Sequence, residues 1–470
     1  MNRLDVFIEG RLVGTVDAVD RRSVRFEYDT AYVSQMASTR LSVSMPLRAT
    51  RYSHATASPY LWGLLPDNDR VLTRWGREFG CSASDVVGLL GGVGTDVAGA
   101  AQYLLPGVVP SESSPGSIEW LTDRDVEQFL RDVRRDTSAW RPNAEGCWSL
   151  AGAQPKIALL YNPDSKRWGL PSGQTPTTHI LKPAIDGLDD FDINEHLCLA
   201  TARNLGLRAA MTTVQSFGNQ RVLVVERYDR IRAGDSIRRV HQEDMCQALG
   251  VHPDQKYESD GGPGSADIAA VVREFCGPGD ASRLFDAMAY NWLVLATDGH
   301  AKNYSLLHSA GQTRLAPLYD IASATPHLHH RKAALAQAIG GERRAFHIRR
   351  RHWERAAPAF GIAPDEAIDR ISDLAVRLPD AFSAAVAQSD FSRTERRIAH
   401  SIADMIVAWT KSAQLTIVAA AHPKLAAPPA AFAGSSKRPI RTGRTDTLGR
   451  PIKVSHRDIE TRATAPPPSS

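Results

Sequence analysis

The sequence predicts a mixed α/β protein in which a small β-sheet precedes a mainly helical half. Three observations support this prediction. The first thirty residues alternate apolar and polar positions, short β-type runs return between residues 148 and 230, and helical apolar spacing dominates after residue 230. With 470 residues, 43% hydrophobic and 23% charged, the chain can bury a large core and form about two to four domains.

Charge and cysteine content narrow the class of protein. Lys and Arg total 56 against 52 Asp and Glu, a balance of +4 that is too small for a protein that coats nucleic acid. The basic excess is local, because residues 431–470 hold eight basic and three acidic side chains. Five scattered cysteines, none in a C-x-x-C pair, predict neither a disulfide framework nor a zinc site. No apolar run approaches the ~18 residues of a membrane span, so we expect a cytoplasmic protein with no membrane partner.

The N-terminal part is predicted to be β-rich and then helical. Residues 4–16 alternate around a bend at Glu9 and Gly10, as in a β-hairpin. After Arg70 the apolar residues recur at helical spacing, until residues 106–117, which are rich in Pro, Ser and Gly. We therefore expect an N-terminal subdomain at residues 1–106, followed by a linker and helical connector at 107–144.

The middle of the chain is predicted to form a small lobe over residues 145–232. Four β-type runs (KIALLY, THILKP, TTVQSF and RVLVVERYD) flank one helical insert, NEHLCLATARNLGL. Helical patterning then dominates residues 233–425, interrupted by a Gly/Pro/Asp-rich stretch at 252–264 and by one hairpin that turns at 309–312. The basic segment 426–470 has little apolar periodicity and is predicted to be disordered.

The segment ATDGHAKNYSLL, residues 296–307, carries the strongest chemical signal. Asp298 follows a predicted helix, and Asn303 lies five residues later, the spacing of the base and the metal-binding Asn in the kinase pattern H-R-D-x-x-x-x-N. Asp320, expected at the end of the hairpin's second strand, adds a second carboxylate. Phosphoryl transfer needs one carboxylate at the attacking hydroxyl, and an amide oxygen and a carboxylate that hold Mg²⁺. A polar loop whose Asp and Asn only cap turns is the alternative, but the hairpin and the third oxygen ligand favour catalysis.

Three further segments fit the same chemistry. The small residues 151–153 would let backbone N–H groups approach an anion, with Lys156 adding positive charge. Lys182, on a predicted strand, and Glu195, on the helical insert, match the phosphate-binding lysine and helix glutamate of a kinase small lobe. The strand that ends at residues 226–228 fits a hinge whose backbone meets an adenine edge. Each segment also has a simpler interpretation. Residues 151–153 could form an ordinary turn, Lys182 could be a surface lysine, and the strand that ends at 226–228 could simply leave the core.

Together, and in this order, the motifs resemble the HipA family, the serine/threonine kinase toxins of bacterial toxin–antitoxin modules. The resemblance extends from about Leu4 to about Thr410 and implies a two-lobed, protein-kinase-like α+β fold. This fold has a β-rich N-terminal subdomain and a mainly helical C-lobe. The motifs are LLPDNDR, GTDVAGA, WSLAGAQPK, THILKP, NEHLCLA, VERYDR, HQEDMCQALG, TDGHAKNYSLL and YDIASA.

The family resemblance also assigns roles to residues. It implies ATP and Mg²⁺ as cofactors, Asp298 as catalytic base, Asn303 and Asp320 as metal ligands, and Ser149 as the autophosphorylation site. A phosphate on Ser149 would add up to about two negative charges and favour ejection of the loop that follows. Pro155 departs from the family pattern and removes one N–H from that loop. The residues implied to bind ATP are Ala151, Gly152, Ala153, Gln154, Lys156, Lys182, Glu226, Arg227, Tyr228, His300, Lys302, Asn303, Tyr319 and Asp320.

These features predict an ATP- and Mg²⁺-dependent serine/threonine protein kinase that arrests growth. The resemblance implies a translation-related protein substrate, such as an aminoacyl-tRNA synthetase, and a HipB-like helix-turn-helix antitoxin through which the protein reaches operator DNA. A catalytically weak co-repressor subunit and a kinase of small hydroxylated molecules are the alternatives. The basic tail beyond Pro429 is either a solubilising end or a contact with operator DNA.

Overall fold

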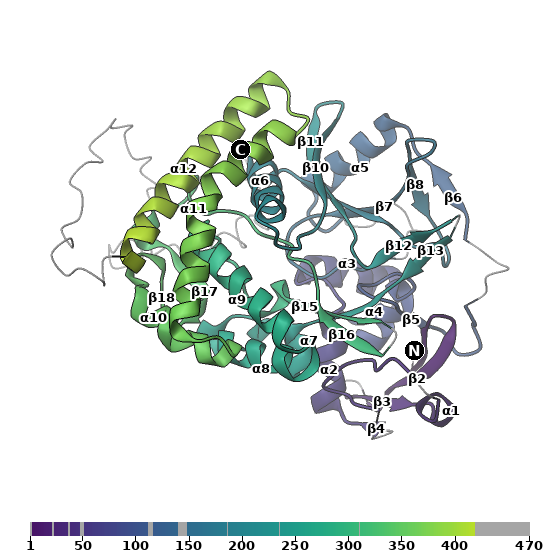
Figure 1. Ribbon diagram of the computed structural model, residues 1–470. Coiled ribbons are helices and arrows are strands. Elements are labelled where there is room, and N and C mark those ends of the chain that lie inside the picture. Colours follow the sequence, from purple (N-terminus) through teal and green to yellow (C-terminus); the bar gives the residue numbers. More distant parts are fainter. Residues whose placement is uncertain are drawn as a thin grey trace, which may run out of the picture.

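The computed structural model describes residues 2–20, 23–35, 38–47, 51–110, 116–139, 148–185, 187–234, 236–309 and 311–418. Within these ranges the chain forms an N-terminal unit (residues 2–110), a small lobe (116–226) and a helical lobe (241–418), as Figure 1 shows. The tail predicted to be disordered lies outside the described residues. Among the described helices, none combines the length and the apolar character that a membrane crossing would require.

The N-terminal unit is built on a five-stranded antiparallel sheet of order β4-β3-β2-β1-β5. The predicted first hairpin is confirmed: β1 and β2 pair around Glu9 and Gly10, whose φ angles of 51° and 73° are the left-handed values of a tight hairpin turn. Helices α2 and α4 pack against the strands. The elements are β1 (Arg3–Ile8), β2 (Arg11–Ala18), β3 (Val24–Tyr28), α1 (Thr30–Val33), β4 (Arg51–Tyr52), α2 (His54–Trp62), α3 (Asp69–Phe79), α4 (Val86–Val93) and β5 (Ala101–Leu104).

The small lobe is a six-stranded antiparallel sheet of order β10-β11-β9-β7-β8-β6. All four predicted strands are present, but the segment expected to be a connector also belongs to this lobe. Its residues Ile118–Trp120 pair with β8, and its helix α5, which begins at a capping box of Thr122 and Asp125, packs on the sheet. The elements are β6 (Ile118–Trp120), α5 (Asp123–Arg135), β7 (Ile157–Asn162), β8 (Arg167–Pro171), β9 (His179–Pro183), α6 (Phe191–Asn204), β10 (Thr212–Phe217) and β11 (Gln220–Glu226).

Between the lobes, three short strands replace helix that the sequence predicted. They are β12 (Arg230–Ala233), β13 (Ser236–Arg239) and β14 (His241–Asp244). The first two form a short, largely exposed hairpin in which four of the eight strand residues are Arg, so their sequence is that of a charged surface segment. The third pairs with β15, the first strand of the hairpin predicted around residues 309–312.

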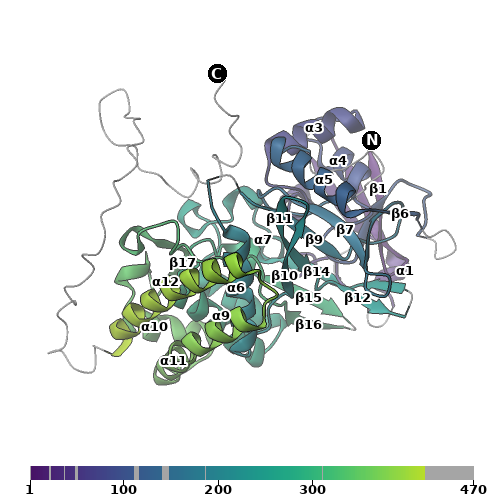
Figure 2. The same cartoon turned by 90° about the horizontal axis from the view of Figure 1, so that it is seen from above.

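The helical lobe surrounds its own apolar core, and the long helices α11 and α12 lie side by side on the side of the molecule away from the N-terminal unit (Figure 2). Helix α6 is buried on nearly all sides because it lies between the small-lobe strands β10 and β11 and the helices α11 and α12. The elements are α7 (Met245–Leu249), α8 (Ser265–Phe275), α9 (Pro278–Leu293), β15 (Ser305–Ser309), β16 (Gln312–Leu315), β17 (Ala334–Ile339), β18 (Glu342–Arg344), α10 (Arg350–Ala356), α11 (Pro364–Gln388) and α12 (Arg393–Val418).

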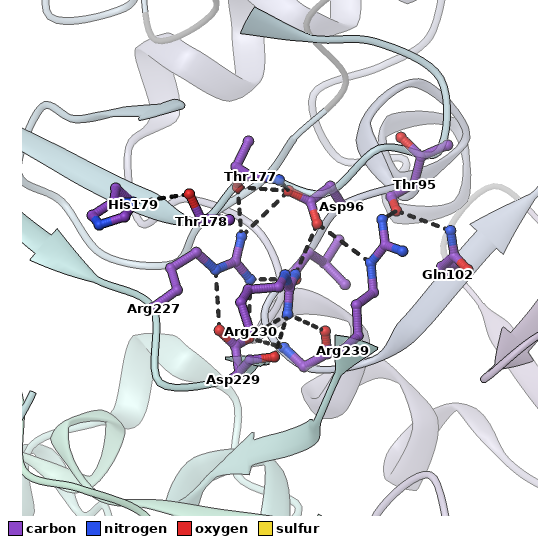
Figure 3. A network of polar contacts seen from close by, with 12 residues as sticks. Thr95, Asp96, Gln102, Thr177, Thr178, His179, Arg227, Asp229, Arg230 and Arg239 are labelled. Carbon is purple, nitrogen blue, oxygen red and sulfur yellow. Dashed lines mark hydrogen bonds and ion pairs between the residues drawn. The ribbon is translucent and has the colours of Figure 1, made fainter. Parts of the chain in front are cut away.

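A buried polar network fixes the N-terminal unit against the end of β11 (Figure 3). The carboxylate of Asp96 accepts hydrogen bonds from Arg230 at 2.8 Å, Arg227 at 3.3 Å and the Thr177 hydroxyl at 2.7 Å. Asp229 pairs with the same two arginines and accepts from the backbone N–H of Gly99 at 2.7 Å. Burial opposes ionisation of Asp96, but the arginines outweigh burial and hold its pKa well below the usual range.

Removing Asp96 should therefore destabilise the whole molecule. Asp96→Ala removes one of the two carboxylates that Arg227 and Arg230 share and the carboxylate that faces the buried Arg239, and we expect unfolding to become easier by about 3–5 kcal/mol. Glu27→Ala is the control, because Glu27 pairs with the exposed Arg51 in the same unit and should leave the urea midpoint nearly unchanged. Equal midpoints for Asp96→Ala and wild type would contradict this account.

Candidate active site

A cavity of about 710 Å³ lies where the three parts of the chain meet. Every residue predicted to bind ATP contributes to its lining, from the phosphate-loop segment 151–156 to Asp320. The N-terminal unit also reaches this cavity through Gly63, Asp67 and Ala98. The fold thus gathers residues as far apart in the sequence as Gly63 and Leu328, 265 positions, around one space.

Lys182 forms two ion pairs that join the small lobe to the helical lobe. Its ammonium lies 2.7 Å from Glu195 Oε1 on α6 and 2.6 Å from Asp320 Oδ1 in the loop after β16. Glu195 is buried, whereas the side chain of Asp320 is 46% exposed and opens onto the cavity. Burial alone would raise the pKa of Asp320, but Lys182 outweighs it and lowers the pKa to about 2. Asp320 is therefore a charged, accessible oxygen ligand at neutral pH.

The position of Asp320 differs from the predicted one. Strand β16 ends at Leu315, so Asp320 lies in the loop beyond the strand and not at its end. Its φ of 57° is in the left-handed region, which is strained for a residue with a Cβ. The ion pair with Lys182 helps to hold this conformation.

The loop of Asp298 begins beyond the end of α9 at Leu293. Leu295, expected inside the helix, instead has a φ of 57° and turns the chain. The amide nitrogen of Asn303 donates to the carbonyl of Asp298 at 3.1 Å and to that of Asp320 at 3.4 Å. Asn303 thus ties the two loops together, and its amide oxygen is the atom suited to bind a cation. The carboxylate of Asp298 accepts a 2.8 Å hydrogen bond from the hydroxyl of Tyr257.

The predicted phosphate loop lies directly before β7. Gly152 has a φ of 104°, and the ammonium of Lys156 donates to the carbonyl of Ala151 at 2.6 Å. Burial and the ammonium of Lys182 lower the pKa of Lys156 to about 7. An anion in the loop would favour the protonated form. Pro155, whose missing N–H marked a departure from the family pattern, is buried next to β7, whereas residues 151–154 are half-buried at the cavity.

Ser149 does not line the cavity. Its side chain is fully buried, its hydroxyl donates to the carbonyl of Leu64 at 2.7 Å, and its N–H donates to the carbonyl of Asp96 at 3.0 Å. Both acceptors belong to the N-terminal unit. In this conformation the hydroxyl is not accessible to a phosphate donor.

The predicted adenine-site segment, residues 226–228, lies at the end of β11. The N–H groups of Glu226 and Arg227 donate to the carbonyls of Met211 and Thr178, each at 2.9 Å. The side chain of Arg227 points into the buried network of Figure 3, and its carbonyl already accepts from the N–H of Arg230 at 3.1 Å. The second lone pair of that carbonyl is therefore the group of Arg227 that can serve a nucleotide.

Two tyrosines form an aromatic part of the cavity wall. The rings of Tyr228 and Tyr319 lie 5.8 Å apart, and the hydroxyl of Tyr319 donates to the carbonyl of Lys302 at 2.6 Å. Tyr319 therefore also supports the loop that carries Asp298 and Asn303. Planar apolar rings of this kind suit a nucleotide base.

The site also contains three residues that were not predicted from the sequence: Asp67, Lys256 and Tyr257. Asp67 accepts hydrogen bonds from Lys256 at 3.1 Å and from Lys302. It belongs to the motif LLPDNDR, which indicated family membership but no chemical role. Lys256 and Tyr257 lie in the stretch 252–264, whose Gly, Pro and Asp content predicted only an interruption of the helical pattern. Asp67 and Lys256 are 189 positions apart, so no local spacing could have connected them.

The residues present fit a nucleotide and a divalent cation. The buried Nδ1 of His300 has no hydrogen-bond partner among the described residues, so it can accept one from a ligand in the cavity. Across the described ranges, no group of three or more His, Cys, Asp or Glu side chains is arranged to hold a metal. Mg²⁺ in kinase sites needs only one or two protein oxygens besides phosphate and water, and Asn303 with Asp320 can supply them.

Comparison with known proteins identifies the family. Residues 4–104 match the model of the HipA N-terminal domain, and residues 148–382 match the HipA-like C-terminal domain. A relative from Sinorhizobium fredii, “Putative kinase Y4mE”, is 33% identical over 88% of this chain and 99% of its own length. The chain belongs to the HipA family of kinases.

A curated HipA and a solved HipA structure extend the comparison. The serine/threonine-protein kinase toxin HipA of Shewanella oneidensis is 27% identical over 75% of this chain and 82% of its own length. The structure of HipA from Shewanella oneidensis MR-1 in complex with HipB and operator DNA superposes with a TM-score of 0.75 at 23% identity. It covers 87% of this chain and 96% of that chain. The likeness confirms the predicted HipA-type α+β fold. Family members are kinases, which use ATP with a divalent metal.

Gly152 offers a test of the phosphate loop. A Cβ at this position would lie 2.8 Å from the Lys156 ammonium, and the backbone is left-handed. We expect Gly152→Ala to weaken the binding of Mg·ATP at least about tenfold, measured by titrating the thermal shift. Gly206→Ala is the matched control, since its φ of +85° brings similar strain but nothing lies within 4 Å. Unchanged nucleotide affinity in Gly152→Ala would count against the loop assignment.

Proposed function

We propose that this chain is an ATP- and Mg²⁺-dependent serine/threonine protein kinase that acts as the toxin of a toxin–antitoxin module. The observation that carries this proposal is the convergence of Lys182, Asp298, Asn303 and Asp320 on one cavity. Membership in the HipA family supports the same reaction. Convergence matters because phosphoryl transfer is catalysed mainly by positioning and charge neutralisation.

The proposed roles follow from the chemistry of each side chain. When bound, ATP supplies the phosphoryl group, and Mg²⁺ neutralises its charge. Asp298 accepts the proton of the attacking hydroxyl, while the amide oxygen of Asn303 and the carboxylate of Asp320 hold the cation. Lys182 and Lys156 bind phosphate oxygens. Tyr257 orients the Asp298 carboxylate through its hydroxyl.

Ser149 is proposed as an autophosphorylation site that becomes accessible once its segment leaves Leu64 and Asp96, and its buried position explains how a phosphate there would switch the kinase off. A phosphate at the buried Ser149 Oγ would bring up to about two negative charges beside the carbonyl of Leu64, an acceptor that cannot pair with them. The segment would have to leave its place, and the phosphate loop that follows would leave with it. Nucleotide contacts would then be lost.

The proposed partners follow from the solved relative, which was captured with HipB and operator DNA. We propose a HipB-like helix-turn-helix antitoxin for this chain, with operator DNA reached through that complex. The substrate is proposed to be a translation-related protein, with aminoacyl-tRNA synthetases as the first candidates. The proposed site of action is the cytoplasm.

Labelling with [γ-³²P]ATP and Mg²⁺ tests the reaction. Wild type should incorporate label at Ser149, located by mass spectrometry, and Asp298→Asn and Asp320→Asn should each reduce incorporation at least about a hundredfold. Asp286→Asn is the matched control, because this aspartate on α9 pairs with Arg370 and does not line the cavity.

Two outcomes would contradict the proposal. Wild type that binds ATP but stays unlabelled would favour a co-repressor. Label that passes to a small hydroxylated molecule and never to protein would favour a small-molecule kinase.

A further inference from the structure

The N-terminal unit places one carboxylate, that of Asp67, inside the catalytic cavity. Its two oxygens bind two ammonium groups of the helical lobe: Oδ2 lies 3.1 Å from Lys256 Nζ, and Oδ1 contacts Lys302 Nζ. All three side chains are largely buried, with 16%, 9% and 4% exposure for Asp67, Lys256 and Lys302. Burial opposes ionisation, but the two lysines outweigh it and hold the pKa of Asp67 well below its usual range.

The backbone of Asp67 is joined to the phosphate loop. Its N–H donates to the carbonyl of Gly152 at 3.1 Å, and the preceding Pro66 forms a β-bridge with the same glycine. The backbone of Asp67 thus contacts the loop that would cradle the phosphates. Its side chain contacts two lysines of the opposite lobe.

The Lys256 segment is in turn connected to the loop of Asp298. The carbonyl of Lys256 accepts from the N–H of Ala301 at 3.2 Å, and the neighbouring Tyr257 donates to Asp298 Oδ1 at 2.8 Å. The Tyr257 ring also lies edge-on to His300, with centroids 4.9 Å apart. Lys256 is therefore held at the same end of the cavity as Asp298.

Charge explains why such an arrangement would matter. Asp67 brings two ammonium groups together between the phosphate loop and the Asp298 loop. Without the carboxylate, the two buried ammonium groups would repel each other and move apart. A positive pair at this place suits an anion that bridges the two loops, which is where a phosphoryl group passes to an acceptor.

We propose that Asp67 is a positioning residue for phosphoryl transfer, which holds the ammonium groups of Lys256 and Lys302 where they contact the transferred group. Lys256 then acts directly on the phosphoryl group as a further catalytic residue. The inference rests on the proposed kinase function and adds to it: the active site is incomplete without the N-terminal unit.

The test uses the full chain and the initial rate of ADP formation as a function of Mg·ATP concentration. Asp67→Asn keeps the size of the side chain and the backbone bond to Gly152 but removes the charge. We expect kcat to fall about 10- to 100-fold with KM for ATP within about threefold of wild type, because misplacing a charged group affects the transition state more than nucleotide binding.

Three further variants separate positioning from general stability. Asp67→Glu should recover part of kcat, because it restores the carboxylate. Lys256→Met should lower kcat as Asp67→Asn does, and the double variant should lose little more than either single one. Asp17→Asn is the control, since Asp17 pairs with Arg3 and Arg25 in the same unit, outside the cavity, and should keep wild-type kcat.

Three results would overturn the inference. They are kcat within twofold of wild type in Asp67→Asn, a rise in KM with unchanged kcat, and a loss of activity that Asp17→Asn matches. If Asp67→Asn does not fold, the test rests on Lys256→Met alone. A wild-type kcat in Lys256→Met then overturns the inference. Asp298→Asn distinguishes the two proposals: if ADP formation persists in it, the kinase assignment itself fails.

Discussion

The three-way contact of Lys182 with Glu195 and Asp320 is the interaction on which the site depends. It links the central part of the small-lobe sheet, the buried helix α6 and a loop of the helical lobe through one ammonium group. Two carboxylates outweigh the cost of burying that charge, so the pKa of Lys182 is raised even though burial opposes it. The contact fixes the distance between the lobes, and it keeps Asp320 ionised and facing the cavity.

The N-terminal unit is a structural part of the kinase body and not an appended module. It shares one continuous apolar core with the small-lobe sheet. Buried polar contacts reinforce this docking: the Asp96 network reaches the end of β11, and the Glu243 carboxylate of β14 accepts from the backbone of Val43 at 2.9 Å. The same unit touches the phosphate loop, Ser149 and the Asp298 side of the cavity. All of these places therefore border on the same unit.

Sequence patterns predicted those elements and site residues that depend only on neighbouring positions in the chain. The Glu9–Gly10 hairpin followed from alternation and turn residues, and the strand around Lys182 followed from the short β-type run THILKP. The spacing of Asp298 and Asn303 indicated a catalytic loop. Strands β12 and β13 were missed because each has only four residues and four of these eight are Arg, a composition typical of an exposed loop. Asp67 and Lys256 were missed because their meeting is a product of the tertiary fold. Asp320 lies in the loop beyond β16, where it pairs with Lys182 of the small lobe, and such a long-range contact leaves no periodic signal in the sequence.

The most direct test of this account is a crystal structure of the full chain with Mn²⁺ and a non-hydrolysable ATP analogue. The account predicts an anomalous peak for the cation in direct contact with the amide oxygen of Asn303 and the carboxylate of Asp320. Lys182 should lie on a phosphate oxygen, and Asp298 should face the terminal phosphoryl group. A nucleotide bound outside this cavity, or a cation that neither Asn303 nor Asp320 touches, would contradict it.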